Sequence, residues 1–291
     1  MYCYLCNSDK FSERKGQVRD NPDLKIYECL SCGLVMLSSI EHITKKYYEN
    51  SESSKAWMNC LQKGDSLQSI EDWLAESYEL DKHRSEKYHN LIENKMVLDF
   101  GCGNGGFLLQ AKTFASGAEG IDLEKRVQEY WKEQIKIYSS IGSGCGKYDL
   151  ITAFHVIEHI PDPIKILKEL SEYLTMDGKI IIEVPNSEDA LLTLYDCDAF
   201  QKYTYWSEHL FLYNKKTLNI LAEKSGLKTL SIDYDQRYPL SNHLYWLSHG
   251  QPGGHKEWES LNSPGLNDEY AKALAKIGKS DTVIGIFEKD N

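Results

Sequence analysis

The chain has 291 residues, of which 41% are hydrophobic, so it is long enough for one large folded domain and a small one. Its formal net charge of -11 gives a broadly negative surface that repels phosphate backbones, and no nucleic-acid partner is expected. The chain has no apolar run of about 18 residues and no signal-peptide pattern at its N-terminus, so we expect a cytoplasmic protein without membrane contact.

Two closely spaced cysteine pairs lie near the N-terminus, Cys3-x-x-Cys6 and Cys29-x-x-Cys32. A two-residue gap lets both thiolates of a pair reach one ion, and two such pairs are typical of a tetrahedral zinc site. Because four sulfurs leave no open position on the ion, we expect a structural zinc in a small ribbon at residues 1–40. The alternative is four unconnected buried thiols.

The rest of the chain predicts an α/β protein. Residues 41–95 are polar and helix-prone, and we expect a helical connection that contributes to the active site. From Met96 onwards, short apolar runs alternate with amphipathic segments, which indicates a Rossmann-like domain at 96–291 with helices on both faces of a seven-stranded sheet. Strands are expected at 96–100, 118–122, 135–138, 148–154, 178–185, 227–235 and 282–287, and helices at 105–116, 124–133, 163–175 and 214–225.

A long segment at 237–280, rich in Pro, Gly, His and Trp, separates the last two expected strands. Insertions of this length above a sheet often form lids or substrate walls, so we expect a substrate lid here. The alternative is that its polar side chains only pack the segment. The candidate substrate-binding residues are Arg237, Asn242, His243 and His255.

A glycine-rich turn with Gly101, Gly103 and Gly105 follows the first expected strand. Glycines let the backbone turn sharply and approach a ligand at the carboxyl edge of a sheet. Asp122 follows roughly 20 residues later, at the end of the next strand, where a carboxylate can accept both hydroxyls of a ribose. Asp99 lies inside the turn and suits a ligand with an ammonium group, such as the methionine part of S-adenosylmethionine.

These segments carry a resemblance to a known family. Val97–Gly106 and Gly120–Arg126 resemble motifs I and II of the class I S-adenosylmethionine-dependent methyltransferases, and Tyr148–Ile160 resembles their fourth-strand segment. The turn at Asp177-Gly178-Lys179 resembles the one before their fifth strand. The resemblance implies a Rossmann-like methyltransferase with S-adenosylmethionine as cofactor.

The same resemblance implies roles for individual residues. The three glycines would line the methionine and ribose, Asp122 would hold the ribose, and Leu123 would flank the adenine. Phe154 and His155 would lie beside the sulfonium, by backbone as much as by side chain.

A second resemblance covers the N-terminal half. Cys29–Leu37 and Lys46–Ser54 resemble the ribbon and the Tyr/Ser segment of the zinc-containing deoxysugar C-methyltransferases, the family that includes tetronitrose C-methyltransferase. In that family a tyrosine after the ribbon and a Glu-His pair after the fifth strand form the active site, with the histidine as base. The matching residues are Tyr47 or Tyr48, Glu208 and His209. The additional C-terminal domain of that family is expected to be absent, and Trp206 stands where those enzymes carry a tyrosine.

Methyl transfer requires an enzyme to position the acceptor and to remove a proton from it. We therefore expect His209 to act as general base, oriented by Glu208; the alternative is a structural histidine, the role we also expect for His159. The leading prediction is methylation of a sugar or nucleotide-linked sugar for a surface polysaccharide or secondary metabolite. The alternatives are ribosomal-RNA methylation and a zinc-ribbon adaptor that senses the cofactor without catalysis.

Overall fold

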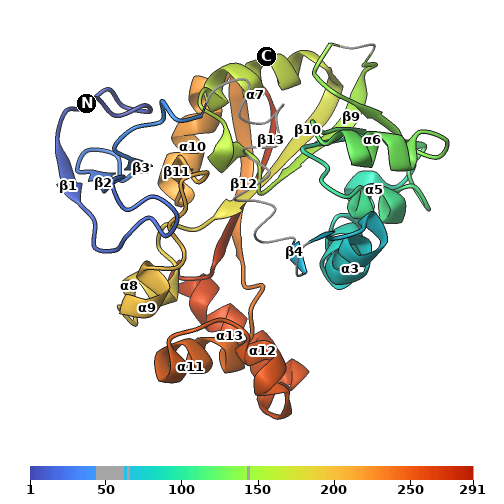
Figure 1. Cartoon of the computed structure of the whole chain (residues 1–291). Helices are drawn as coiled ribbons and strands as arrows, with labels where there is room; N and C mark the ends of the chain where they lie inside the picture. The colour runs from blue at the N-terminus through green and yellow to red at the C-terminus, as the bar shows by residue number, and fades with distance from the viewer. Residues whose placement is uncertain (44–61, 64–65, 143–144, 291) are drawn as a thin grey trace.

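A seven-stranded mixed sheet forms the centre of the computed structural model, which describes residues 1–43, 62–63, 66–142 and 145–290 (Figure 1). The strand order is β12-β13-β10-β9-β6-β7-β8, and β13 runs antiparallel to both of its neighbours. This sheet confirms the predicted Rossmann-like fold. Its strands are β6 (Met96–Phe100), β7 (Gly117–Ile121), β8 (Lys136–Tyr138), β9 (Tyr148–Phe154), β10 (Leu174–Pro185), β12 (Leu227–Asp235) and β13 (Thr282–Lys289).

Helices cover both faces of the sheet. Consecutive side chains of a strand point to opposite faces, and the apolar side chains on both faces have to be shielded from water. In β10, Ile180 and Ile182 belong to the same buried cluster as Leu218, whereas Ile181 packs in a second cluster with Phe107. The helices are α3 (Ile70–Lys87), α4 (His89–Ile92), α5 (Gly106–Ala111), α6 (Lys125–Trp131), α7 (Pro163–Glu172) and α10 (Lys215–Lys224).

The N-terminal residues form a small sheet that the larger domain completes. Its order is β1-β2-β3-β11, with β1 (Phe11–Glu13), β2 (Ile26–Cys29), β3 (Val35–Leu37) and β11 (Phe211–Leu212). Phe211 pairs with Met36 across this boundary, and both side chains are buried. The ribbon is therefore joined by backbone hydrogen bonds to the segment that directly follows His209.

Most of the expected lid segment is helical. It contains α11 (Leu240–His249), α12 (Gly254–Glu257), the 3-10 turn η2 (Glu259–Leu261) and α13 (Pro264–Lys276). Standard capping residues bound two of these helices: Gly250 ends α11 in a left-handed conformation, and the Ser263 side chain accepts from the backbone of Leu266 at the start of α13. Figure 1 shows these helices grouped beyond the ends of β12 and β13.

Short elements complete the described chain. They are the hairpin β4 (Gln62–Lys63) and β5 (Ser66–Leu67), the 3-10 turn η1 (Ile157–His159), α8 (Ala190–Thr193) and α9 (Asp198–Gln201). None of the helices in the described ranges combines the length and the apolarity that a membrane crossing requires.

Candidate active site and zinc site

The four N-terminal cysteines converge on one point. Cys3 Sγ lies 3.5 Å from Cys32 Sγ, Cys6 Sγ lies 3.5 Å from Cys29 Sγ, and all four sulfurs lie within 4.8 Å of one another. Zn–S bonds of about 2.3 Å place the sulfurs of a tetrahedral site roughly 3.8 Å apart, so this donor set fits one zinc ion.

Each cysteine pair is shaped by the same tight turn. The backbone N–H of Asn7 donates to the carbonyl of Cys3, and that of Gly33 donates to the carbonyl of Cys29; both Asn7 and Gly33 have positive φ. Burial disfavours the Cys29 thiolate, but backbone N–H groups such as that of Cys32 outweigh it and lower the pKa of this thiol. Burial raises the pKa of Cys3 and of Cys32 in the same cluster, so the convergence of the four sulfurs, and not their acidity, indicates the metal site.

The glycine-rich turn between β6 and α5 requires glycine for both conformation and space. Gly101, Gly103 and Gly105 have φ values of 73°, 52° and 81°. A Cβ on Gly105 would lie 2.5 Å from Nε1 of Trp131, and this nitrogen donates to the carbonyl of Asn104. The turn therefore keeps a fixed shape, with its backbone at the carboxyl edge of the sheet.

Asp122 links the end of β7 to this turn. Its Oδ2 accepts from the backbone N–H of Gly103 at 2.8 Å, and its Oδ1 accepts from that of Glu124 at 2.8 Å. Burial raises the pKa of Asp122 to about 6, so the carboxylate is ionised at neutral pH. The adjacent Leu123 is 45% exposed, which leaves an apolar surface free for a ring to cover.

Asp99 lies beneath the turn rather than in it. Its side chain is buried, and its Oδ1 accepts a hydrogen bond of 2.7 Å from Thr152 of the neighbouring strand β9. Burial raises the pKa of Asp99 to about 7. The structure thus places this carboxylate between two strands.

Helix α3 closes over the turn with residues that the sequence analysis did not single out as site residues. The Trp73 ring lies 3.4 Å from where a Cβ on Gly103 would stand. Ser77 donates to Asp81 at 2.6 Å and accepts from the Asn104 amide at 2.9 Å. Positions 73, 77 and 81 share one helix face, and this four-residue spacing was the available signal.

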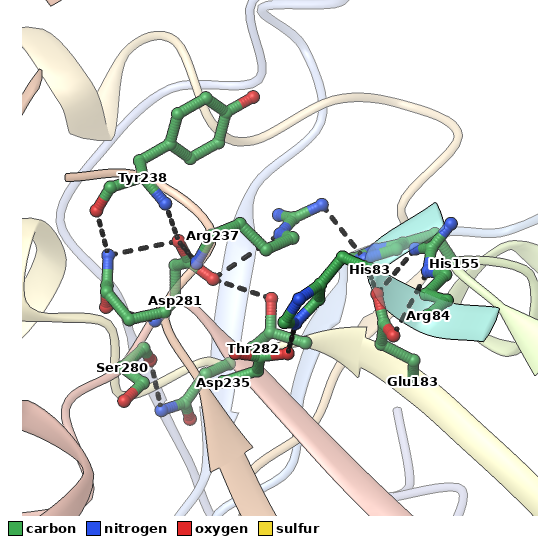
Figure 2. Close-up of polar contacts among 12 residues, drawn as sticks. His83, Arg84, His155, Glu183, Asp235, Arg237, Tyr238, Ser280, Asp281 and Thr282 are labelled. Atoms are coloured by element: carbon green, nitrogen blue, oxygen red, sulfur yellow. Dashed lines mark hydrogen bonds and ion pairs between the residues drawn. The ribbon is translucent and has the colours of Figure 1, made fainter. Parts of the chain in front are cut away.

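A chain of charged groups crosses the sheet edge from α3 to the start of β13, as Figure 2 shows. Arg84 Nη2 lies 2.5 Å from Glu183 Oε1, and the same oxygen lies 3.0 Å from His155 Nε2. Arg237 Nη1 lies 2.9 Å from this histidine nitrogen, and Arg237 Nε lies 3.4 Å from Asp281 Oδ1. Burial disfavours the ionised form of Glu183, but Arg84 and His155 hold its pKa well below the usual range.

Phe154 and His155 differ in where their side chains lie. Phe154 is buried beneath α3, where its ring stacks against Tyr88 and lies 4.5 Å from the Arg84 guanidinium. His155 has a φ of 56°, a left-handed conformation that is uncommon outside glycine, and its ring enters the charged chain.

A cavity of about 180 Å³ lies between the loop after β10 and helices α11 and α12. His209 and all four candidate substrate-binding residues line it, although they come from distant parts of the chain. Its lining includes Asn186, Asp189, Tyr203, His209, Arg237, Tyr238, Asn242, His243, Trp246, His255 and Asp281. A more open hollow of about 690 Å³, lined by Lys215, Tyr234 and Gly278 among others, includes none of the predicted site residues.

Burial sets the charge of the titratable groups in this cavity. It lowers the pKa of His209 to about 3 and that of His243 to about 4, so both imidazoles are neutral at neutral pH. It raises the pKa of Asp189 to about 7. For Arg237 burial opposes the charge, but Asp281 outweighs it and raises the pKa, so the guanidinium keeps its charge.

The structure does not unite every predicted catalytic residue. Tyr47 and Tyr48 lie outside the described residues. Glu208 is buried, and its backbone carbonyl lies 3.0 Å from Nδ1 of His159. The carboxylate that shares a cluster with His159 and His209 is that of Glu158, which the sequence analysis did not select.

Comparisons with known proteins identify the class to which this site belongs. Residues 73–232, more than half of the chain, match the family model described as a methyltransferase domain, and the chain belongs to this family. It is an S-adenosylmethionine-dependent methyltransferase, as the glycine-rich turn and the sheet predicted.

Its relatives differ in how far they extend along the chain. The ubiquinone biosynthesis O-methyltransferase of Acinetobacter baylyi is 26% identical over 178 residues, which cover 54% of this chain and 73% of that protein. The protein of the same name from Coxiella burnetii is 26% identical over 170 residues, which cover 52% and 71%. A solved S-adenosylmethionine-dependent methyltransferase from Archaeoglobus fulgidus shares the fold, with a TM-score of 0.50 and 19% identity over 73% of this chain and 95% of that chain.

Proposed function

We propose that this methyltransferase methylates a sugar or nucleotide-linked sugar, with His209 as the general base that takes the acceptor's proton. The observation that carries the proposal is the cavity that His209 shares with Arg237, Asn242, His243 and His255. Aromatic rings beside hydrogen-bonding side chains suit the faces and edges of a carbohydrate, and a guanidinium suits a linked phosphate.

On the cofactor side, Gly101, Gly103 and Gly105 would line the methionine and ribose of S-adenosylmethionine, and Asp122 would accept the ribose hydroxyls. Leu123 would cover the adenine, and the backbone at Phe154 and His155 would pass beside the sulfonium. Asp99 would act on the methionine end through the charge beneath the turn. When bound, the cofactor supplies an already activated methyl group, so this chain has to orient the acceptor and hold its proton.

On the acceptor side, Arg237 and His255 would contact a phosphate, and Asn242 and His243 would donate to or accept from sugar hydroxyls. Glu208 would support the loop of His209, and Tyr47 or Tyr48 would contact the acceptor. The ribbon of residues 1–40 would hold a structural zinc at Cys3, Cys6, Cys29 and Cys32, the connection at 41–95 would complete the active site, and 237–280 would serve as substrate lid.

A second candidate is oxygen methylation of a phenolic small molecule. It is favoured by the relatives named for ubiquinone biosynthesis O-methylation. The two candidates predict different acceptors for the same base.

The test begins with an acceptor panel of nucleotide-linked sugars, keto-sugars and phenols, with transfer of labelled methyl as the measurement. On the best acceptor, His209→Ala is expected to lower turnover by about 10²–10⁴-fold, because this is the usual contribution of a placed base. Cofactor affinity should be unchanged, since the glycine-rich turn follows β6 whereas His209 lies in the loop after β10.

His249→Ala is the matched control, because His249 is an exposed histidine of α11 that does not line the cavity. Transfer to phenols but to no sugar would favour the second candidate. Turnover of His209→Ala within about threefold of wild type would return this histidine to a structural role.

A further inference from the structure

We propose that Glu158, and not the adjacent Glu208, is the carboxylate that orients His209 and stabilises its protonated form. The inference rests on the proposed function, in which His209 takes a proton from the acceptor. Glu158 lies in the 3-10 turn η1 directly after β9, and its role would be that of a positioning residue.

The starting observation is a buried carboxylate with incomplete hydrogen bonding. Glu158 is fully buried, and neither of its oxygens has a hydrogen-bond partner within the described residues. Burial raises its pKa, but the neighbouring His155 leads the effects that outweigh burial and hold the pKa below its usual value, so the group is ionised. An ionised carboxylate at such a site requires donors.

The first neighbouring histidine, His159, cannot donate a hydrogen bond to Glu158 while its ring is neutral. His159 Nδ1 lies 3.0 Å from the carbonyl oxygen of Glu208, which only accepts, so the proton of the ring sits on Nδ1. Nε2 of His159 therefore carries a lone pair, and it lies 3.9 Å from Glu158 Oε1. Burial lowers the pKa of His159, which keeps the ring neutral.

The second histidine can serve one oxygen at most. His155 Nδ1 lies 3.4 Å from Glu158 Oε1, and its other nitrogen is engaged by Glu183 and Arg237. One carboxylate oxygen still lacks a donor.

The third histidine, His209, has a ring nitrogen that lacks a hydrogen-bond acceptor. Nδ1 of His209 is buried and has no hydrogen-bond partner among the described residues. One ring nitrogen of His209 lies within 4.8 Å of a carboxylate oxygen of Glu158 and of a ring nitrogen of His159. A small movement that brings Nδ1–H of His209 to Glu158 would satisfy both buried groups at once.

This bond would fix the tautomer of the base. With the proton on Nδ1, Nε2 of His209 keeps its lone pair for the acceptor. In the reaction the acceptor's proton passes to Nε2, the acceptor's electron pair forms the bond to the methyl carbon, and the pair of the broken sulfur–carbon bond stays on sulfur. His209 becomes an imidazolium, and Glu158 supplies the negative charge beside it.

The other groups around the ring cannot replace this charge. Besides burial, His159, His155 and Arg19 oppose a proton on His209, whereas Glu158 favours it. Arg19 comes from the ribbon and lies 4.7 Å from the Trp206 ring, and the buried hydroxyl of Tyr213 approaches the cluster from the end of β11. Removal of Glu158 would leave a base that resists protonation.

The closing experiment reads the ring nitrogens of His209 by ¹⁵N NMR at neutral pH, without any acceptor. Wild-type protein is expected to carry the proton on Nδ1. Glu158→Gln should keep this tautomer, because an amide oxygen still accepts, and Glu158→Leu should shift the proton to Nε2. Glu208→Gln should change nothing, and His159, held by a backbone carbonyl, serves as internal reference in every variant.

Measurement of turnover then separates the two effects of Glu158, which are the orientation of the His209 ring and the stabilisation of its protonated form. Glu158→Gln is expected to lower turnover at least tenfold, as part of the roughly 10²–10⁴-fold contribution of a placed base, while the control Glu172→Gln, at an exposed carboxylate of α7, stays close to wild type. Calorimetry with S-adenosylmethionine checks that each variant is folded. If His209→Ala retains turnover but Glu158→Leu shifts the tautomer, the proposed function fails while the orienting role of Glu158 stands.

Three results would overturn the inference. They are a wild-type His209 with its proton on Nε2, a tautomer that responds to Glu208→Gln and not to Glu158→Leu, and a second bound zinc per chain that Glu158→Gln removes. The last would make Glu158, His159 and His209 a metal site.

Discussion

The glycine-rich turn, proposed to bind the cofactor, and the cavity, proposed to bind the acceptor, lie at the same edge of the sheet but are built in different ways. The turn takes Gly101, Gly103 and Gly105 from one loop, with Asp122 added from the end of the neighbouring strand. The cavity takes His209 from the loop after β10 and Arg237 from the segment after β12, and the rest of its lining comes from other elements. The cofactor side therefore depends on local backbone conformation, and the acceptor side depends on how distant segments are held together.

The ribbon is one of the parts that hold the wall of the cavity. Asp20 accepts from the backbone N–H and the hydroxyl of Ser207, and His42 contacts the Ser207 carbonyl at 2.8 Å. Arg14 donates to the carbonyl of Ser187. These contacts hold the segments that carry the cavity-lining residues Asn186 and His209, so disruption of the ribbon should affect the acceptor far more than the cofactor.

Cys29→Ser gives the largest expected effect and tests this division. Structural zinc contributes on the order of 10 kcal/mol in zinc-finger peptides, so the variant should lose about one zinc per chain and the order of the ribbon. Turnover should fall more than about tenfold, with S-adenosylmethionine affinity nearly unchanged, because the ribbon contacts the Ser207 loop and, through Tyr4, the start of α7, whereas the glycine-rich turn is held by Asp122 and α3.

Elemental analysis, turnover and calorimetry measure the three quantities, and Cys145→Ser, at an isolated half-buried cysteine, is the control. A loss of cofactor affinity as large as the loss of turnover would show that the ribbon supports the glycine-rich turn as much as the cavity.

Gly105→Ala should have a smaller effect, and it should act on the glycine-rich turn rather than on the cavity. The new Cβ would meet Trp131 at 2.5 Å in a left-handed conformation, so we expect the free energy of unfolding to fall by about 2–4 kcal/mol and cofactor affinity to fall with it. Urea unfolding measures the first and calorimetry the second. Gly146→Ala is the control, because its Cβ would meet nothing within 4 Å. Unchanged stability of Gly105→Ala would mean that the turn is not as rigid as its geometry implies.

Acidification should weaken cofactor binding, the smallest effect of the three. Burial raises the pKa of Asp122 to about 6, so above this pH the ionised carboxylate would accept the proposed ribose hydroxyls, and below it protonation removes the charge. Affinity should therefore fall as the pH drops through about 6, and Asp122→Asn should bind about 1.5–3 kcal/mol more weakly at neutral pH, with a flat pH profile. Calorimetry from pH 5 to 8 measures this, with the exposed Asp177→Asn as control. A wild-type affinity independent of pH would contradict the assigned role.

The sheet was more predictable from sequence than the cavity for a physical reason. β6 and β9 match the expected 96–100 and 148–154 because each is an apolar run ended by a turn, a pattern that local residues determine. The helices of the lid segment were not predicted, since their apolar positions are interleaved with polar ones and packing determines their structure.

Within the candidate site, the glycine turn follows from backbone conformation, which the sequence reveals. The neighbours of His209 do not follow in this way. Glu208 is adjacent to it in the chain, yet the clustered carboxylate is Glu158, whose backbone carbonyl in η1 accepts a hydrogen bond from Leu210 of the loop after β10. Contacts of this kind depend on tertiary packing, so no spacing rule within a single sequence reveals them.

The reversed strand β13 has a consequence for the history of the molecule. Asp235, the last residue of β12, pairs directly with Thr282, the first residue of β13, so the whole helical segment between them leaves and re-enters the sheet at one point. A segment attached in this way can be lengthened, shortened or exchanged between enzymes while the sheet and the glycine turn stay intact. Exchange of this segment offers a natural route by which one inherited cofactor domain acquires new acceptors.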